Sequence, residues 1–274
     1  MDTIGIICNS NLISRKIGYM IGLGVGMRKL HGSEHLEGSL FPDAPMKYDW
    51  MVGWARGMEY MIDHEKEFVY GIPSDLDRYN VYFASFAHPL KYIVSQLTSI
   101  PFEYFSDCRK KNEYIINLRT YEYRKREKED HIVTPMDFFK SRWPEAYDHV
   151  LSGTHDNPDG DLWMALNDYV IYFGFYVCRS FLGKDIWTRV EEMTNKNFPP
   201  DPSSIRVYID VRARSEYDYI RSLGGKFIRI ESMKDNGSII YDLDLDSVPV
   251  DLSLPEDDIF NPDRIYDFVS QNYK

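Results

Sequence analysis

Short apolar runs alternate along the chain with segments whose apolar residues recur at helical spacing. The run at 4–8 is typical of a buried strand, and a helix is predicted at 14–30 in spite of its four glycines. A second strand is predicted at 80–85, followed by a helix from Pro89 to about Leu97. Strands that alternate with helices in this way favour a parallel sheet.

The alternation is clearest in the C-terminal half of the chain. A strand is predicted at 205–211, then a helix at 215–223 that Gly224 and Gly225 end, then a strand at 226–231. Three more elements complete the pattern, namely a helix at 161–181, a short strand near 258–260 and a helix at 262–271. We therefore predict an α/β fold with three layers, in which helices cover both faces of an open, mostly parallel sheet.

Two stretches interrupt this alternation. Residues 31–79 hold a polar loop and a helix predicted at 50–62. Residues 107–160 are charged and rich in turn-forming residues, and the alternating pattern at 113–123 is typical of a hairpin or an exposed arm. We predict a single domain over residues 1–274, with a helical insertion at 31–79 and an arm or lid-like insertion at 107–160.

Charge and cysteine content narrow the classes of partner. The 32 Lys and Arg against 43 Asp and Glu give a net charge of -11, which repels nucleic acid and anionic membranes, so neither is a predicted partner. Cys8, Cys108 and Cys178 lie far apart without a CxxC pair, so no disulfide framework and no metal site are predicted. No apolar run approaches the roughly 20 residues that span a bilayer. We expect a cytoplasmic protein.

Ligands of an open parallel sheet bind at the carboxyl ends of its strands. Asp210 and Arg212 lie at that end of the strand predicted at 205–211. An aspartate there can orient a metal-bound water, and an arginine can hold a phosphate in a bidentate fork. The alternative is that Asp210 caps the next helix and Arg212 lies on the surface, and spacing alone favours this alternative.

Three groups of residues resemble, in the same order, motifs of the phage deoxynucleoside monophosphate kinases. They are Phe86-Ala-His-Pro-Leu-Lys91, then Tyr172-Phe-Gly-Phe-Tyr-Val-Cys-Arg179 with Phe181-Leu-Gly-Lys-Asp-Ile-Trp187, and Tyr208-Ile-Asp-Val-Arg212 with Glu216 and Leu223-Gly-Gly225. The resemblance implies a P-loop kinase fold that transfers the γ-phosphoryl of ATP, with Mg²⁺, to a deoxynucleoside monophosphate. It also implies that Lys91, Arg179, Asp210, Arg212 and Glu216 surround the acceptor and phosphate groups. Gly174-Phe175 stands where the family has Gly-Thr, and Ile209 stands where it has Thr or Ser before the Asp, which leaves the acceptor open.

The stretch after the first predicted strand, Cys8-Asn-Ser-Asn-Leu-Ile-Ser-Arg-Lys16, departs from a phosphate loop. The motif GxxxxGK[ST] needs glycines whose N–H groups cradle phosphates, a Lys for the β- and γ-phosphates, and a hydroxyl for Mg²⁺. Aligned without gaps, the Lys position falls on Ser14 and the second Gly on Ile13. Shifted by two residues, Lys16 takes the Lys position, but Ser10, Arg15 and Ile17 replace the two glycines and the hydroxyl.

Either alignment removes several groups that would stabilise a transferring phosphoryl. Loss of one comparable donor costs about 10² to 10³ in rate, so efficient transfer from ATP is not expected. Arg15 or Lys16 could still attract an anion to a helix N-terminus.

A second resemblance covers residues 17–60. Ile17-Gly-Tyr-Met-Ile-Gly-Leu-Gly24, Leu40-Phe-Pro42 and Trp50-Met-Val-Gly-Trp-Ala-Arg-Gly57 resemble the ribosome modulation factor pattern, which implies a helical pair that binds ribosomes. The charges of this segment nearly cancel, whereas an rRNA contact needs a net positive charge. A protein-binding or structural role for Trp50 and Trp54 is therefore favoured.

Two functions remain open from the sequence. The first is a degenerate kinase-like protein of phage origin that binds a nucleotide, or a host or phage protein through the 31–79 insertion. The second is an active deoxynucleoside monophosphate kinase that uses ATP and Mg²⁺. The candidate residues are Lys16 and Asp210 for catalysis, Arg15, Lys16, Lys91, Arg179, Asp210, Arg212 and Glu216 for nucleotide or phosphate, and Trp50 and Trp54 for a protein partner.

Overall fold

The computed structural model describes residues 2–8, 13–22, 81–107, 109–135, 162–231, 247–255, 258 and 261–272. The chain divides into two compact units, one formed by 1–86 with 188–274 and the other by 87–187. The predicted insertion at 31–79, with Trp50 and Trp54, lies outside the described residues, as does Ser10. The predicted boundaries of both insertions stay predictions.

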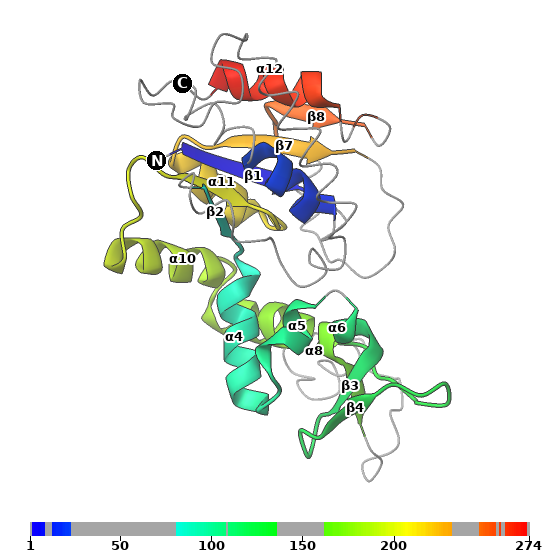
Figure 1. Ribbon diagram of the computed structural model, residues 1–274. Coiled ribbons are helices and arrows are strands. Elements are labelled where there is room, and N and C mark those ends of the chain that lie inside the picture. Colours follow the sequence, from blue (N-terminus) through cyan, green and yellow to red (C-terminus); the bar gives the residue numbers. More distant parts are fainter. Residues whose placement is uncertain are drawn as a thin grey trace, which may run out of the picture. The chain divides into compact units, whose positions relative to one another are not determined.

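The first unit is built on a parallel sheet. Its five strands are β1 (Asp2–Ile7), β2 (Val81–Ala84), β6 (Ile205–Tyr208), β7 (Lys226–Ile230) and β8 (Leu252–Leu254). They lie in the order β2-β6-β1-β7-β8, and every neighbouring pair is parallel (Figure 1). Ile4 and Ile6 on one face of β1 enter the main core, while Gly5 lies on the other face.

The strand order creates a switch point beside β1. From β1 the chain first moves to β2 at one edge, returns to β6, and then crosses to β7 and β8 on the other side of β1. The carboxyl ends of the neighbouring strands β1 and β6 therefore lie where the direction of the connections changes, which is the usual ligand position in such sheets. The order is consistent with P-loop-like folds, and the predicted α/β class with an open parallel sheet is confirmed.

Helices cover both faces of the sheet. The helix of residues 13–22 follows β1 and, with α12 (Pro262–Asn272), contributes to the main core on one face. Its fit is close, because a Cβ on Gly18 would lie 3.0 Å from Cγ2 of Ile209 and 3.4 Å from the ring of Phe83. The remainder of the helix predicted at 14–30 lies outside the described residues.

The opposite face carries α11 (Arg214–Ser222). Tyr217 of this helix packs on the ring of Phe227 with centroids 4.4 Å apart. Phe227 in turn lies over Gly5, where a Cβ would come within 2.3 Å of a ring carbon. The helix ends at Ser222, and Gly224 follows its C-cap with a φ of 77° that suits glycine, which agrees with the predicted end of this helix.

The last strand differs from the prediction near 258–260. β8 lies at Leu252–Leu254 instead, paired with β7 through Ile228 and Ile230, and Asp258 lies in a turn. Asp258 is therefore not in a strand, while 259–260 lie outside the described residues. The sequence did not indicate β8, because a three-residue strand owes its pairing to its neighbour in the sheet rather than to a local pattern of its own.

The second unit combines helices with a small antiparallel sheet, in the strand order β4-β3-β5 (Figure 1). Its elements are α4 (Ala87–Thr98), α5 (Phe102–Ser106), α6 (Lys110–Glu113), β3 (Tyr114–Asn117), β4 (Tyr123–Lys125), β5 (Trp163–Ala165), α8 (Leu166–Ile171), the π-helix η3 (Tyr172–Arg179) and α9 (Ser180–Leu182). The pairing of β3 with β4 confirms the hairpin predicted at 113–123.

The helix predicted at 161–181 begins later than expected. Trp163, Met164 and Ala165 form β5, which pairs with β3, and helical structure starts at Leu166. The strand was not predicted, because the apolar residues at 163–165 fit the helical spacing of the following segment as well as a short strand. α10 (Ile186–Asn197) follows and continues into the first unit. Within the described segments, no helix is both long and apolar enough to cross a membrane.

Candidate ligand site at the carboxyl ends of β2 and β6

Two polar side chains meet where β2 and β6 end. Ser85 follows β2 directly, and Asp210 lies two residues beyond β6. The Ser85 hydroxyl donates a hydrogen bond to Oδ2 of Asp210 across 125 residues of sequence. This contact fixes the orientation of the Asp210 carboxylate at the sheet end.

The backbone holds this turn against the neighbouring strands. The N–H of Ile209 donates to the carbonyl of Ala84 at 3.2 Å, and the N–H of Val211 donates to the carbonyl of Ile6 in β1 at 3.3 Å. The chain after β6 is thus tied to both of its neighbours in the sheet. Because Asp210 lies between these two hydrogen bonds, its position is set by the sheet rather than by a free loop.

The second carboxylate oxygen of Asp210 has a different environment. Oδ1 is buried and receives no hydrogen bond from the described residues. A buried carboxylate oxygen without a donor is costly, and such atoms are rare in folded proteins. The atom is therefore suited to accept a donor group or a cation from a ligand.

Glu216 holds the turn that carries Arg212. Its side chain is buried, and Oε2 accepts the backbone N–H of Arg212 at 2.7 Å and of Ala213 at 3.0 Å. This is the glutamate half of a capping box at the start of α11. The structure thus gives the capping role to Glu216 rather than to Asp210, and Arg212 is half-buried rather than on the surface. A direct contact of Glu216 with phosphate stays a prediction.

A polar network between β6 and α10 supports the site, and it was not predicted from the sequence. Arg206 donates to Oε1 of Glu191 at 3.0 Å and also to Asn195, and the Tyr208 hydroxyl donates to the same Glu191 oxygen at 2.8 Å. Burial raises the pKa of Tyr208 above its ordinary value, and the adjacent Glu191 carboxylate raises it further. Phe86 stacks on Tyr208 with centroids 4.8 Å apart. The network ties α10 to β6, the strand that precedes Asp210.

The described residues that follow β1, from Ile13 onward, are packed into the fold, while 9–12 lie outside the described residues. Ser14, at the Lys position of the ungapped alignment, is 2% exposed, and Arg15 is 7% exposed. Arg15 and Lys16 both have interaction partners within the protein. A phosphate loop presents backbone N–H groups and a lysine to its ligand, whereas this first helical turn is packed into the fold.

Lys91 and Arg179 belong to the second unit, whereas Asp210 and Arg212 belong to the first. Lys91 is half-buried on α4. Arg179 ends η3, where its Nε donates to the carbonyl of Lys184 at 2.9 Å and its guanidinium lies 5.3 Å from the ring centre of Phe175. The structure therefore brings Ser85, Asp210, Arg212 and Glu216 together, while the contribution of Lys91 and Arg179 to this site stays a prediction.

No known protein family model matches the chain, and no curated protein is significantly similar to it. The site must therefore be judged on its own geometry.

Proposed function

We propose that this chain is a kinase-like binding protein of phage origin that acts in the host cytoplasm, binds a deoxynucleoside monophosphate and has lost efficient use of ATP. The observation that supports this most directly is the grouping of Ser85, Asp210 and Arg212 at the carboxyl ends of β2 and β6, in a sheet with a P-loop-like strand order. On the donor side, the burial of Ser14 and Arg15 supports the loss of efficient ATP use.

The proposed roles follow from the chemistry of each side chain. Arg212 would bind the phosphate, since a guanidinium forms charge-assisted hydrogen bonds to its oxygens. Asp210 is anionic and repels phosphate, so its buried Oδ1 would accept a hydroxyl or amino group of the nucleoside. Ser85 orients Asp210, and Glu216 keeps the Arg212 turn in place.

An active deoxynucleoside monophosphate kinase is the second candidate. The buried Oδ1 of Asp210 favours it, because an acidic oxygen on the strand next to β1 could instead hold a Mg²⁺-bound water. Lys16 lies in the helix that follows β1 and is half-buried. In this function Lys16 would supply the cation that the loop otherwise lacks.

Binding and turnover distinguish the two candidates. The purified full chain is titrated with each deoxynucleoside monophosphate by calorimetry, and ADP release is measured with ATP and Mg²⁺. We expect binding of at least one monophosphate without appreciable ADP release. Arg212→Ala should weaken binding about 10- to 100-fold. Arg214→Ala is the matched control, because Arg214 lies two residues further on and pairs with Asp218 at the surface.

Each alternative result has a defined meaning. Turnover that Lys16→Ala abolishes would replace the binding function with the kinase function. Absence of both binding and turnover would contradict both nucleotide functions and leave a protein partner, to be sought by pulldown from host lysate.

A further inference from the structure

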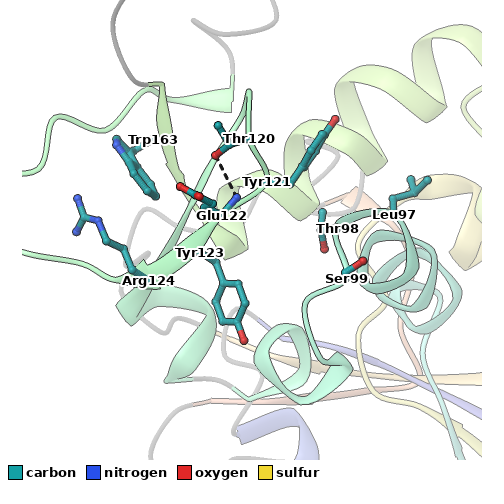
Figure 2. A pocket seen from close by; sticks show the side chains of 9 residues that line it. All are labelled: Leu97, Thr98, Ser99, Thr120, Tyr121, Glu122, Tyr123, Arg124 and Trp163. Carbon is teal, nitrogen blue, oxygen red and sulfur yellow. Dashed lines mark hydrogen bonds between the residues drawn. The ribbon is translucent and has the colours of Figure 1, made fainter.

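A groove in the second unit has no role in the proposed function. Its volume is about 740 Å³, which falls within the roughly 300–1,000 Å³ typical of small-ligand sites. Three segments line it, namely the end of α4, the β3–β4 turn with β4, and the start of β5. Figure 2 shows the lining residues, which are Leu97, Thr98, Ser99, Thr120, Tyr121, Glu122, Tyr123, Arg124 and Trp163.

The backbone is unusual at two points of this groove. In the described part of the chain, the non-glycine residues with positive φ are Ser99, at 57°, and Tyr121, at 61°, and both line the groove. Glycine adopts this conformation without strain, whereas a bulky side chain does not. Glycine at position 121 would relieve the backbone, but it would remove the ring and the hydroxyl contact of Tyr121 with Tyr169.

The turn that presents Tyr121 is held by side-chain hydrogen bonds. Oδ1 of Asn117 accepts the N–H groups of Arg119 at 2.9 Å and of Thr120 at 3.2 Å. The N–H of Glu122 donates to the Thr120 hydroxyl at 3.3 Å, as drawn in Figure 2. The turn is therefore fixed before any ligand arrives, which lowers the entropic cost of binding.

Aromatic rings form much of the groove wall. Tyr121 is 46% exposed and Tyr123 is 37% exposed. Trp163 already holds a cation, because the guanidinium of Arg124 lies 4.5 Å from its ring centre. Faces of Tyr and Trp rings attract ammonium and guanidinium groups through the ring quadrupole.

The groove lining holds one acid, Glu122, and one base, Arg124. Arg124 is neutralised by a two-point contact with Asp130, and its hydrogen bond lowers the pKa of that carboxyl group. Glu122 has no such partner, since within the described segments no cation or donor contacts its carboxylate. The lining therefore combines one uncompensated negative charge with exposed ring faces.

We propose that this groove binds an organic cation, through the carboxylate of Glu122 and the exposed ring of Tyr121. The cation is an ammonium or guanidinium group, which either a free small molecule or a Lys or Arg side chain of another protein can supply. The site uses no residue of the group at Asp210 and stands independently of the proposed nucleotide function.

NMR chemical-shift titration of the full chain tests the site with two probes. The first is methylguanidinium, with isosteric but neutral methylurea as its control. The second is a Gly-Arg-Gly peptide blocked at both ends, with citrulline in place of Arg as its control. We expect shifts at the groove with the charged probes only. A higher affinity for the peptide than for methylguanidinium would identify a protein side chain as the natural ligand. An equal or lower affinity would identify a free cation.

Three variants connect binding to the groove. Glu122→Gln removes the charge while keeping the shape, and Tyr121→Gly removes the ring while easing the backbone at φ 61°. Each should weaken binding about 5- to 30-fold. Glu129→Gln is the matched control, because Glu129 is an exposed acid of the same unit outside the groove. The affinity of this variant for the charged probes should not change. The proposal is overturned if the neutral probes bind equally well, if neither charged probe binds, or if Glu129→Gln weakens binding as much as Glu122→Gln.

Discussion

Polar and aromatic side chains are used differently in the two units of the chain. In the parallel-sheet unit, Arg206, Glu191 and Tyr208 satisfy one another beneath the end of β6. In the second unit, Tyr121 and Tyr123 stay exposed on a hairpin, although exposure of large apolar surface gains nothing for stability. The first arrangement fixes a strand end, whereas the second leaves surface available for contact.

The two units also differ in how side chains pack against their buried glycines. Gly5 lies in a central strand beneath the fully buried ring of Phe227, and Tyr217 packs on the same ring. Gly174 lies in η3 against the end of Leu90, a side chain that can rotate. A rigid ring between two elements leaves little room for adjustment, whereas the branched end of Leu90, although buried, can change its rotamer. The parallel sheet is thus expected to tolerate change less than the second unit.

The largest expected effect comes from Gly5→Ala. The added Cβ would lie 2.3 Å from Cε1 of Phe227, so ring and strand must separate, at about 2–3 kcal/mol of unfolding free energy. Chemical denaturation measures the loss, and hydrogen exchange should show it in the amides of β1, β6 and β7 rather than in β3 and β4. Gly224→Ala is the control, because nothing lies within 4 Å of its Cβ and only the backbone at φ 77° is strained, at about 1 kcal/mol. Equal losses in both variants would disprove the packing argument.

A smaller effect is expected at alkaline pH. Because burial and Glu191 raise the pKa of Tyr208 in the folded state, the folded protein keeps a proton that the unfolded chain releases above about pH 10. The ionisation of Tyr208 therefore leaves the unfolding free energy unchanged below that pH. Above it, the unfolding free energy falls by about 1.4 kcal/mol per pH unit. Urea unfolding from pH 8 to 11 measures the slope. Tyr208→Phe should make it shallower by that amount, and an unchanged slope would contradict the assignment.

Local signals in the sequence explain why the main sheet was predictable. The apolar runs of β1 and β6 and the glycines after α11 are readable within a few residues, and Gly224 has the positive φ that ends a helix. β5 and β8 have three residues each, and their pairing depends on β3 and β7 far away in the sequence. No short window contains that information.

In the candidate site, too, some residues are indicated by local sequence signals and others depend on contacts between distant segments. Asp210 and Arg212 could be predicted because they follow a strand. Ser85 could not, since its hydrogen bond to Asp210 spans 125 residues. The capping role of Glu216 was hidden by Ala213, because a capping box normally begins with Ser or Thr. Glu191 and Asn195 are one helical turn apart on α10, a spacing that suggests a shared face but not a partner strand.

The smallest expected effect, Gly174→Ala, tests whether the second unit is the more tolerant one. The new Cβ would lie 2.3 Å from Cδ2 of Leu90, as close as the contact at Gly5, but a leucine end can rotate away. Alanine also favours helical structure over glycine by about 1 kcal/mol, which offsets part of the strain. We therefore expect a net loss below about 1 kcal/mol in thermal or urea unfolding.

The carbonyl of Gly174 supplies an internal control for this variant. It accepts the indole N–H of Trp187 at 3.2 Å, so a shift of η3 would disturb that hydrogen bond and the tryptophan environment. Leu90→Val in the Gly174→Ala background shortens the opposing side chain and should recover the loss if the contact with Leu90 is its cause. A loss as large as that of Gly5→Ala, with no recovery, would show that η3 is as tightly constrained as the central strand, and the contrast between the two units would then not extend to their packing.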